Sequence, residues 1–123
     1  MSRNLQAETE EELQLIKEYT LFPILLDMLA RDLNELKLYQ DRVIYNHLIF
    51  YLQKMEHFVH AELQNIKNEM KKRGIRILDT QTSTVGIDVE YKVRGYIHHF
   101  RMLKSLIKAE LVTLLFNIGR ELK

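Results

Sequence analysis

Helix-breaking residues are scarce in this chain of 123 residues, which contains one proline and four glycines. Proline lacks a backbone donor and glycine loses much entropy in a helix, so long stretches without either favour helices. The longest such stretch runs from residue 24 to residue 73. A chain of this length has room for one hydrophobic core. The sequence therefore predicts a single, mainly α domain over residues 1–123, built from three long helices.

The first helical region runs from Glu8 to Leu38. Its apolar residues recur at intervals of three and four, which is the spacing of one helix face. They are Tyr19, Phe22, Leu26, Leu29, Leu33 and Leu36. Pro23 falls within the run, and Thr20 lies three residues earlier, where it would cap a new helix with the proline in its first turn. We therefore expect the first helix to be broken near Pro23.

A second, unbroken helix is expected over residues 41–73. Apolar residues keep the helical period from Ile44 to Met70. Asp41 is a suitable N-cap residue, and Gly74 is placed to cap the C-terminus. The three basic residues before this glycine suit the negative end of the helix dipole.

The apolar period changes from about 3.6 residues to two after Gly74. Hydrophobic and polar residues alternate over 75–80 and again over 87–93, with a polar loop between them. We expect a β-hairpin at about residues 75–93, which must pack on the helices or on another chain because two strands alone are marginal in water. The helical period returns near Tyr96, so the last helix is expected from there to about Gly119.

The last helix is apolar on more than one side, which is more than a small monomer covers easily. Exposed apolar patches of this kind usually mark an interface. We therefore expect a homodimer that shares this helix, with the hairpin reaching the partner, although the same residues would also fill a monomer core. The expected interface residues are Leu103, Ile107, Leu111, Leu114, Leu115 and Ile118.

Charge is balanced over the whole chain, at a formal +1, but not along it. Residues 1–41 hold four basic and nine acidic side chains, whereas residues 42–123 hold 14 basic and eight acidic. This asymmetry would orient the two ends of the chain against each other, or leave a basic surface for nucleic acid. The residues expected at such a surface are Lys71, Lys72, Arg73, Arg76, Lys92 and Arg94. A helix followed by a basic hairpin is similar to a winged DNA-binding domain, but the long second helix leaves no room for a helix-turn-helix.

No pattern of residues predicts catalysis or a bound cofactor. The chain has no cysteine, no serine in a Gly-x-Ser-x-Gly setting and no glycine-rich phosphate loop. His57 and His60 share a helix face, and His98 and His99 would complete a metal site. No glutamate has a histidine three residues after it, as di-iron bundles require, so surface histidines explain this pattern better. We expect no metal, no cofactor and no enzyme.

The chain also lacks the signals of membrane insertion. No apolar run approaches the ~20 residues of a spanning helix, and the first twelve residues are acidic where a signal peptide would be basic and then apolar. We expect a soluble, cytoplasmic protein that does not enter the membrane.

Two segments carry a resemblance to a known family: KKRGIRI at residues 71–77 and YKVRGY at residues 91–96. With the order of helix, basic stretch, hairpin and apolar helix, the second half of the chain resembles small YhjD-type proteins of spore-forming bacteria. The resemblance implies a bacterial source and transfers no functional residue.

Two classes of function stay open. Excess apolar helix surface without a catalytic constellation favours an interaction module, an adaptor or regulator that binds another protein. The alternative is a nucleic-acid-binding regulator that uses the basic hairpin region.

Overall fold

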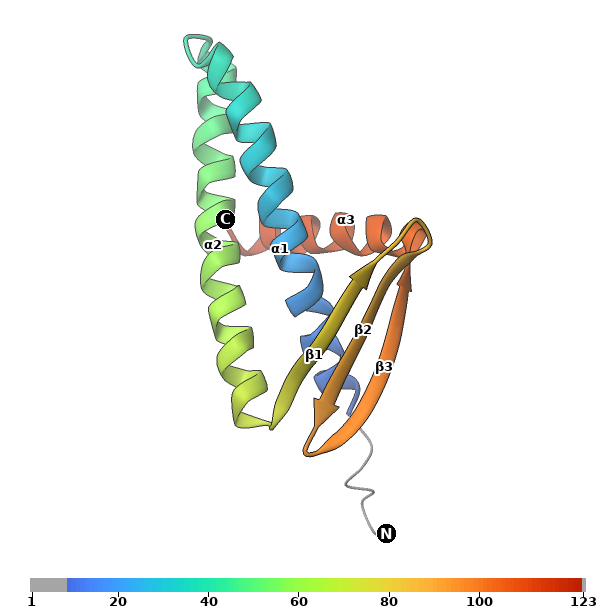
Figure 1. Cartoon of the computed structure of the whole chain (residues 1–123). Helices are drawn as coiled ribbons and strands as arrows, with labels where there is room; N and C mark the ends of the chain where they lie inside the picture. The colour runs from blue at the N-terminus through green and yellow to red at the C-terminus, as the bar shows by residue number, and fades with distance from the viewer. Residues whose placement is uncertain (1–8, 123) are drawn as a thin grey trace.

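The computed structural model describes residues 9–122 and contains three long α-helices and one antiparallel sheet (Figure 1). In chain order, the elements are α1 (Glu10–Leu36), the 3-10 turn η1 (Lys37–Tyr39), α2 (Val43–Lys72), β1 (Ile75–Thr82), β2 (Gly86–Val93), β3 (Tyr96–Leu103) and α3 (Lys104–Glu121). Helices α1 and α2 form a long antiparallel hairpin. The sheet packs beside its lower half, and α3 crosses it near the middle. The mainly helical fold with a β-hairpin before the last helix is confirmed, but the helices do not form a bundle.

Helix α1 is continuous through Pro23, so the expected break is wrong. Its N-terminus lies at Thr9, whose hydroxyl accepts from the Glu12 N–H at 3.1 Å while the Glu12 carboxylate accepts from the Thr9 N–H at 3.0 Å. Thr20 caps nothing and instead donates to the Ile16 carbonyl at 2.8 Å within the helix. A proline inside a helix costs about 3 kcal/mol. Burial of Leu21, Phe22 and Leu25 around it offsets this cost, at about 2 kcal/mol for each side chain.

Helix α2 is unbroken, as expected, and spans Val43–Lys72, so the predicted N-cap at Asp41 lies one residue too early. Arg42 occupies the N-cap position in an extended conformation and makes no side-chain capping bond. At the other end, Gly74 has a φ of +69°, which confirms its expected role beyond the last helical turn. The turn η1 joins the two long helices, so the chain reverses within a few residues.

The sheet has three strands in the order β1-β2-β3, one more than the sequence analysis predicted. Residues 96–103 form β3, which shortens the last helix to α3. The cause is the two-residue turn at Arg94 and Gly95, where φ is +50° and +91°. Positive φ at both positions defines a type I′ turn, whose twist favours a tight hairpin. The apolar residues around Phe100 have helical spacing, but the tight turn at residues 94–95 makes this segment a strand instead.

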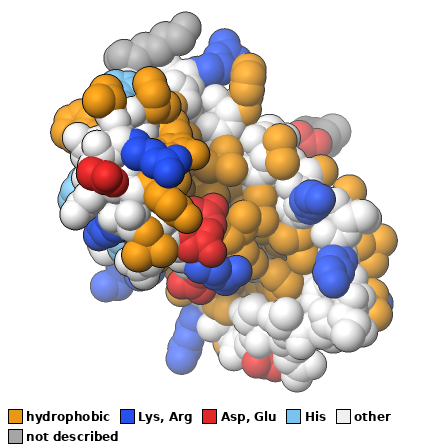
Figure 2. Space-filling model, turned by 90° about the horizontal axis from the view of Figure 1, so that it is seen from above, with side chains coloured by type: hydrophobic (Ala, Val, Ile, Leu, Met, Phe, Trp, Pro, Cys, Tyr) orange, Lys and Arg blue, Asp and Glu red, His pale blue; other side chains and the backbone are white. Residues whose placement is uncertain are grey.

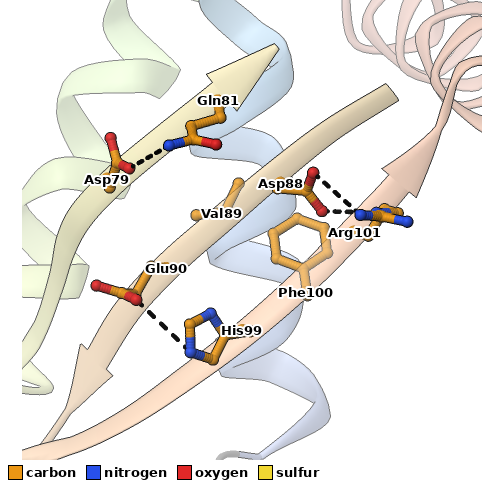
Figure 3. A pocket seen from close by; sticks show the side chains of 8 residues that line it. All are labelled: Asp79, Gln81, Asp88, Val89, Glu90, His99, Phe100 and Arg101. Atoms are coloured by element: carbon orange, nitrogen blue, oxygen red, sulfur yellow. Dashed lines mark hydrogen bonds and ion pairs between the residues drawn. The ribbon is translucent and has the colours of Figure 1, made fainter. Parts of the chain in front are cut away.

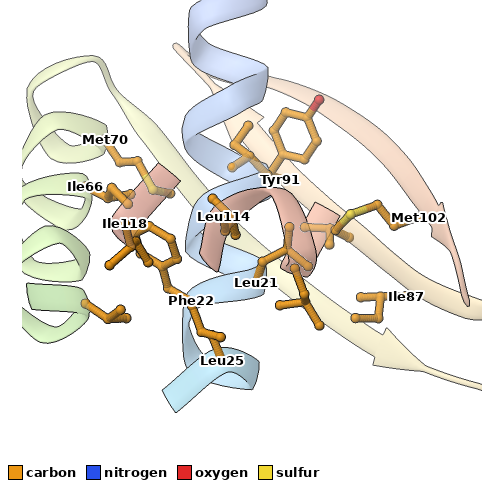
Figure 4. Packing of buried hydrophobic residues seen from close by; sticks show 14 of the residues in the cluster. Leu21, Phe22, Leu25, Ile66, Met70, Ile87, Tyr91, Met102, Leu114 and Ile118 are labelled. Carbon is orange, nitrogen blue, oxygen red and sulfur yellow. The ribbon is translucent and has the colours of Figure 1, made fainter. Parts of the chain in front are cut away.

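The core lies where the sheet, the lower hairpin and α3 meet (Figure 4). Alternate residues of β2 point into it, and all four are buried: Ile87, Val89, Tyr91 and Val93. Helix α1 contributes Ile16, Leu21 and Leu25, while Leu114 and Ile118 come from α3. Farther out, the α1–α2 hairpin extends past α3, and there Leu33 and Ile49 are buried outside this main cluster. The outer part of the hairpin is therefore a two-helix arm, in which α1 and α2 pack against each other away from the main core.

Candidate functional site

The acidic start of α1 and the basic ends of α2 and β2 form two ion pairs. Arg94 binds Glu12 through two hydrogen bonds of 2.7 and 3.0 Å, and Arg73 lies 2.8 Å from Glu11 and 3.0 Å from Glu69. Glu12 is 3% exposed, and hydrogen bonding to Arg94 lowers its pKa from 4.5 to about 2 against the opposing effect of burial. Part of the charge asymmetry along the chain therefore joins its N-terminal region to the hairpin.

These ion pairs change the set of basic residues expected to contact nucleic acid. Arg73 and Arg94 hold glutamates of α1, and Arg94 also donates to the Arg73 carbonyl at 3.3 Å. Lys71, Lys72 and Arg76 are exposed, and Lys92 is half-buried. The structure brings the six residues to one end of the molecule but uses two of them internally. Contact with nucleic acid stays a prediction.

The residues expected at a dimer interface are divided by the structure. Leu111, Leu114 and Ile118 are buried in the chain's own core, and Ile107 and Leu115 pack against it. Leu103 is exposed at the end of β3. The exposed apolar residues of α3 are others, namely Leu106, Val112 and Phe116. Most of the apolar excess of this helix therefore fills the monomer core, and the dimer itself stays a prediction.

The histidines do not form a metal site. His57 and His60 are exposed on α2, whereas His98 and His99 point to opposite faces of β3. Among residues 9–122, no group of three or more histidines and carboxylates is placed to hold a metal ion. His98 stacks on Tyr91 with ring centroids 5.5 Å apart, which gives it a packing role.

The open face of the sheet carries a cleft of about 550 Å³ (Figure 3). Its polar side chains bind one another: Arg101 lies 2.6 Å from Asp88, His99 lies 3.6 Å from Glu90, and Gln81 donates to Asp79 at 3.2 Å. These pairs are exposed and contact no activated nucleophile, so the cleft has no catalytic arrangement.

A second cleft of about 420 Å³ lies where α3 meets α1 and α2. Phe22, Phe58, Leu114 and Ile118 are among its apolar lining, and Glu18, Glu62 and Glu121 are its acidic residues. Burial raises the pKa of Glu18, and the nearby Glu62 adds to this effect. No local pattern in the sequence distinguishes Glu18 from other glutamates, because its burial depends on how the three helices cross.

The end of the helical arm exposes large apolar side chains. Val43, Ile44 and Leu38 are 83%, 71% and 76% exposed, and the set also includes Met28, Tyr39, Leu48 and Phe50. Seven of the 15 large exposed apolar residues in the described chain thus lie within residues 28–50. Figure 2 shows hydrophobic side chains over the end of the hairpin and in the hollow beside it. Such clustering differs from the scattered apolar residues of ordinary surfaces.

One side of the arm forms a groove of about 400 Å³, which we name the hairpin-end groove. It is lined by Asp32, Glu35, Leu36, Tyr39 and Leu52. Leu48 and Ile44 precede Leu52 by one and two turns of α2, so they extend its apolar stripe. The guanidinium of Arg42 lies 5.2 Å from the Tyr39 ring centroid and 5.6 Å from that of Tyr45, which stabilises the helical turn-around beside the groove.

A comparison with protein families finds a match over nearly the whole chain. The model of the family described as YhjD protein matches residues 7–121. The chain belongs to the YhjD family. Neither a curated protein nor a solved structure matches it. The family assignment confirms the resemblance carried by residues 71–77 and 91–96, and it extends that resemblance to the first half of the chain.

The helices of this YhjD-family chain give one further finding. Among residues 9–122, none of them combines the length and the apolar character that crossing a membrane requires.

Proposed function

We propose that this YhjD-family chain is a small cytoplasmic protein-interaction module, an adaptor or regulator whose hairpin-end groove holds a basic amphipathic helix of a partner protein. The observation that carries the proposal is the apolar surface of the two-helix arm, which projects beyond the core. A third helix laid along the arm would cover Ile44 and Leu48 and convert the two-helix pair into a small bundle.

The charge of the groove selects the chemistry of the partner. Asp32 and Glu35 are exposed at its rim, and no ion pair within residues 9–122 occupies either carboxylate. Lysine or arginine side chains of a bound helix would meet these carboxylates while its apolar side chains enter between Leu36 and Leu52. Complementary charge of this kind mainly gives specificity and faster association, whereas the apolar contacts give affinity.

A designed peptide tests this proposal directly. A fluorescent Leu–Lys amphipathic peptide of about 20 residues is expected to bind the protein, and binding should weaken about tenfold in an Asp32→Asn, Glu35→Gln variant at low salt. An Ile44→Ser, Leu48→Ser variant should lose binding, because the apolar stripe supplies most of the affinity. Fluorescence anisotropy measures each dissociation constant.

Two controls separate groove binding from general attraction. Asp79→Asn with Glu90→Gln makes the same change of charge on the sheet and should leave binding unchanged. A Leu–Glu peptide of equal length should not bind. Equal affinity of the Leu–Lys peptide for all variants, or no binding to the unmodified protein, would contradict the proposed groove.

A further inference from the structure

We propose that two copies of this chain pair antiparallel through the free edges of β3, which joins their sheets into one six-stranded sheet with Phe100 on the two-fold axis. This inference concerns a different surface from the hairpin-end groove and does not depend on it. It also changes the expected dimer interface from the buried face of α3 to an exposed strand.

The edge of β3 has the features of a strand that pairs with another. All eight residues of β3 are in register with β2, without interruption. Within the described part of the chain, β2 is the only strand hydrogen-bonded to β3, and α3 is the only other element whose backbone lies close to it. By contrast, the register of β1 shifts between Ile77 and Asp79, and such a bulge discourages edge-to-edge pairing. β3 also contains no proline and no lysine, the residues that commonly protect an edge.

The hydrogen-bonding pattern shows which residues of β3 face the open edge. The Lys104 N–H donates to the Val85 carbonyl at 2.9 Å, directly beyond the end of the β2–β3 ladder. Even-numbered residues therefore direct their backbone groups toward β2, and odd-numbered residues direct theirs to the free edge, because the direction alternates along a strand. Ile97, His99, Arg101 and Leu103 thus present N–H and C=O groups that a further strand would satisfy.

A two-fold axis limits the pairing to a few registers. When Phe100 lies on the axis, the residue numbers of each opposed pair sum to 200. Ile97 of each copy then faces Leu103 of the other copy, so this pair forms twice. His99 of each copy faces Arg101 of the other. Ile97 and Leu103 are 57% and 45% exposed, so this register covers an apolar residue at each end of both strands. Moving the axis to His99 would instead place Ile97 opposite Arg101, which leaves the apolar pair unmatched.

The second copy is the occupant that this edge fits best. Antiparallel pairing of identical strands produces a closed two-fold dimer, in which each side offers the surface that the other needs. Arg101 lies 2.6 Å from Asp88, and His99 lies near Glu90. Acidic side chains of β2 therefore balance the basic side chains of β3, which reduces their repulsion of a second β3 strand. Leu103, one of the interface residues expected from the sequence, lies within the proposed interface.

The oligomeric state is the first test. The unmodified chain is expected to sediment at twice its mass of 14.8 kDa at micromolar concentration. His99→Pro removes one donor from the free edge and none from the β2–β3 ladder, so it should shift the protein to monomer. Val85→Lys, at an exposed loop position, should leave the dimer intact. A monomeric unmodified protein, or a folded His99→Pro protein that remains dimeric, would overturn the inference.

Cysteine cross-linking tests the register and does not require the proline variant to fold. The chain has no natural cysteine. In the double variant Ile97→Cys, Leu103→Cys, the cysteine at position 97 of one copy lies opposite the cysteine at position 103 of the other. Their Cα atoms are then ~5.5 Å apart, which is within disulfide range. Mild oxidation should give a covalent dimer. Each single variant should stay uncross-linked, because like positions lie ~20 Å apart. A 1:1 mixture of the two single variants should again cross-link.

Two results would contradict this register. Equal cross-linking of the single and double variants would show that contact is random. Self-cross-linking of His99→Cys, without cross-linking of the double variant, would place the two-fold axis at residue 99.

Discussion

Replacing Glu12 by glutamine is expected to lower the free energy of unfolding by about 2 kcal/mol at neutral pH. The carboxylate is 3% exposed and binds Arg94 through two charge-assisted hydrogen bonds. A pKa lowered from 4.5 to about 2 corresponds to about 3 kcal/mol, and partial exposure of Arg94 to solvent reduces this estimate. Chemical denaturation followed by far-ultraviolet circular dichroism measures the change.

The same ion pair predicts how stability depends on acid. The folded-state pKa of Glu12 lies below its value in the unfolded chain, so the unfolded state takes up the proton first as the pH falls. The stabilisation is therefore complete above about pH 4.5 and disappears between pH 4.5 and pH 2. The Glu12→Gln protein should lose less stability across this window than the unmodified protein.

Glu11 supplies a matched control one residue away. It also pairs with an arginine, at 2.8 Å from Arg73, but its side chain is 72% exposed. Glu11→Gln should change the free energy of unfolding by less than about 1 kcal/mol, because exposed ion pairs contribute little. Equal effects of the two substitutions would show that the buried pair with Arg94 does not hold the N-terminus of α1 to the sheet.

Local sequence signals predicted the elements that local chemistry determines. The unbroken run before Gly74 gave the length of α2, and the alternation around Tyr91 gave the strand at the centre of the sheet. The helix break predicted at Pro23 was wrong because a sequence shows only the local free-energy cost of a proline in a helix. The burial of Phe22 and Leu25, which offsets that cost, depends on the tertiary fold. Arg94 was not expected to adopt a positive φ, so the turn into β3 was missed.

The candidate groove was not predictable in the same way. Ile44 and Leu48 belong to the apolar stripe that runs from Ile44 to Met70, so their spacing does not distinguish them from Met55, which is buried. The structure exposes Ile44 and Leu48 because α3 and the sheet cover only the lower part of the hairpin. Apolar spacing predicts the face of a helix that is buried, but not the point along the helix at which its covering ends.

Gly86→Ala adds one methyl group to the sheet and is expected to lower the free energy of unfolding more than a glycine-to-alanine substitution elsewhere in the sheet. Gly86 begins β2 opposite Leu103, and a Cβ there would overlap the Met102 carbonyl oxygen and lie 2.9 Å from the carbonyl carbon. These are backbone atoms and have no alternative rotamer, so β3 must move away. We expect a loss of about 3 kcal/mol and a melting temperature lower by about 10 °C.

Gly95→Ala separates this crowding from the cost of backbone conformation. Gly95 has a φ of +91°, and a Cβ there would have no neighbour within 4 Å. Its substitution should cost about 1 kcal/mol, through left-handed strain alone. Because Gly86 lies where the β1–β2 loop meets the start of α3, its substitution should also disturb the bond from the Lys104 N–H to the Val85 carbonyl. Faster amide exchange at Lys104 in Gly86→Ala, but not in Gly95→Ala, would show this loss; equal stability of the two variants would contradict the close approach of β2 and β3.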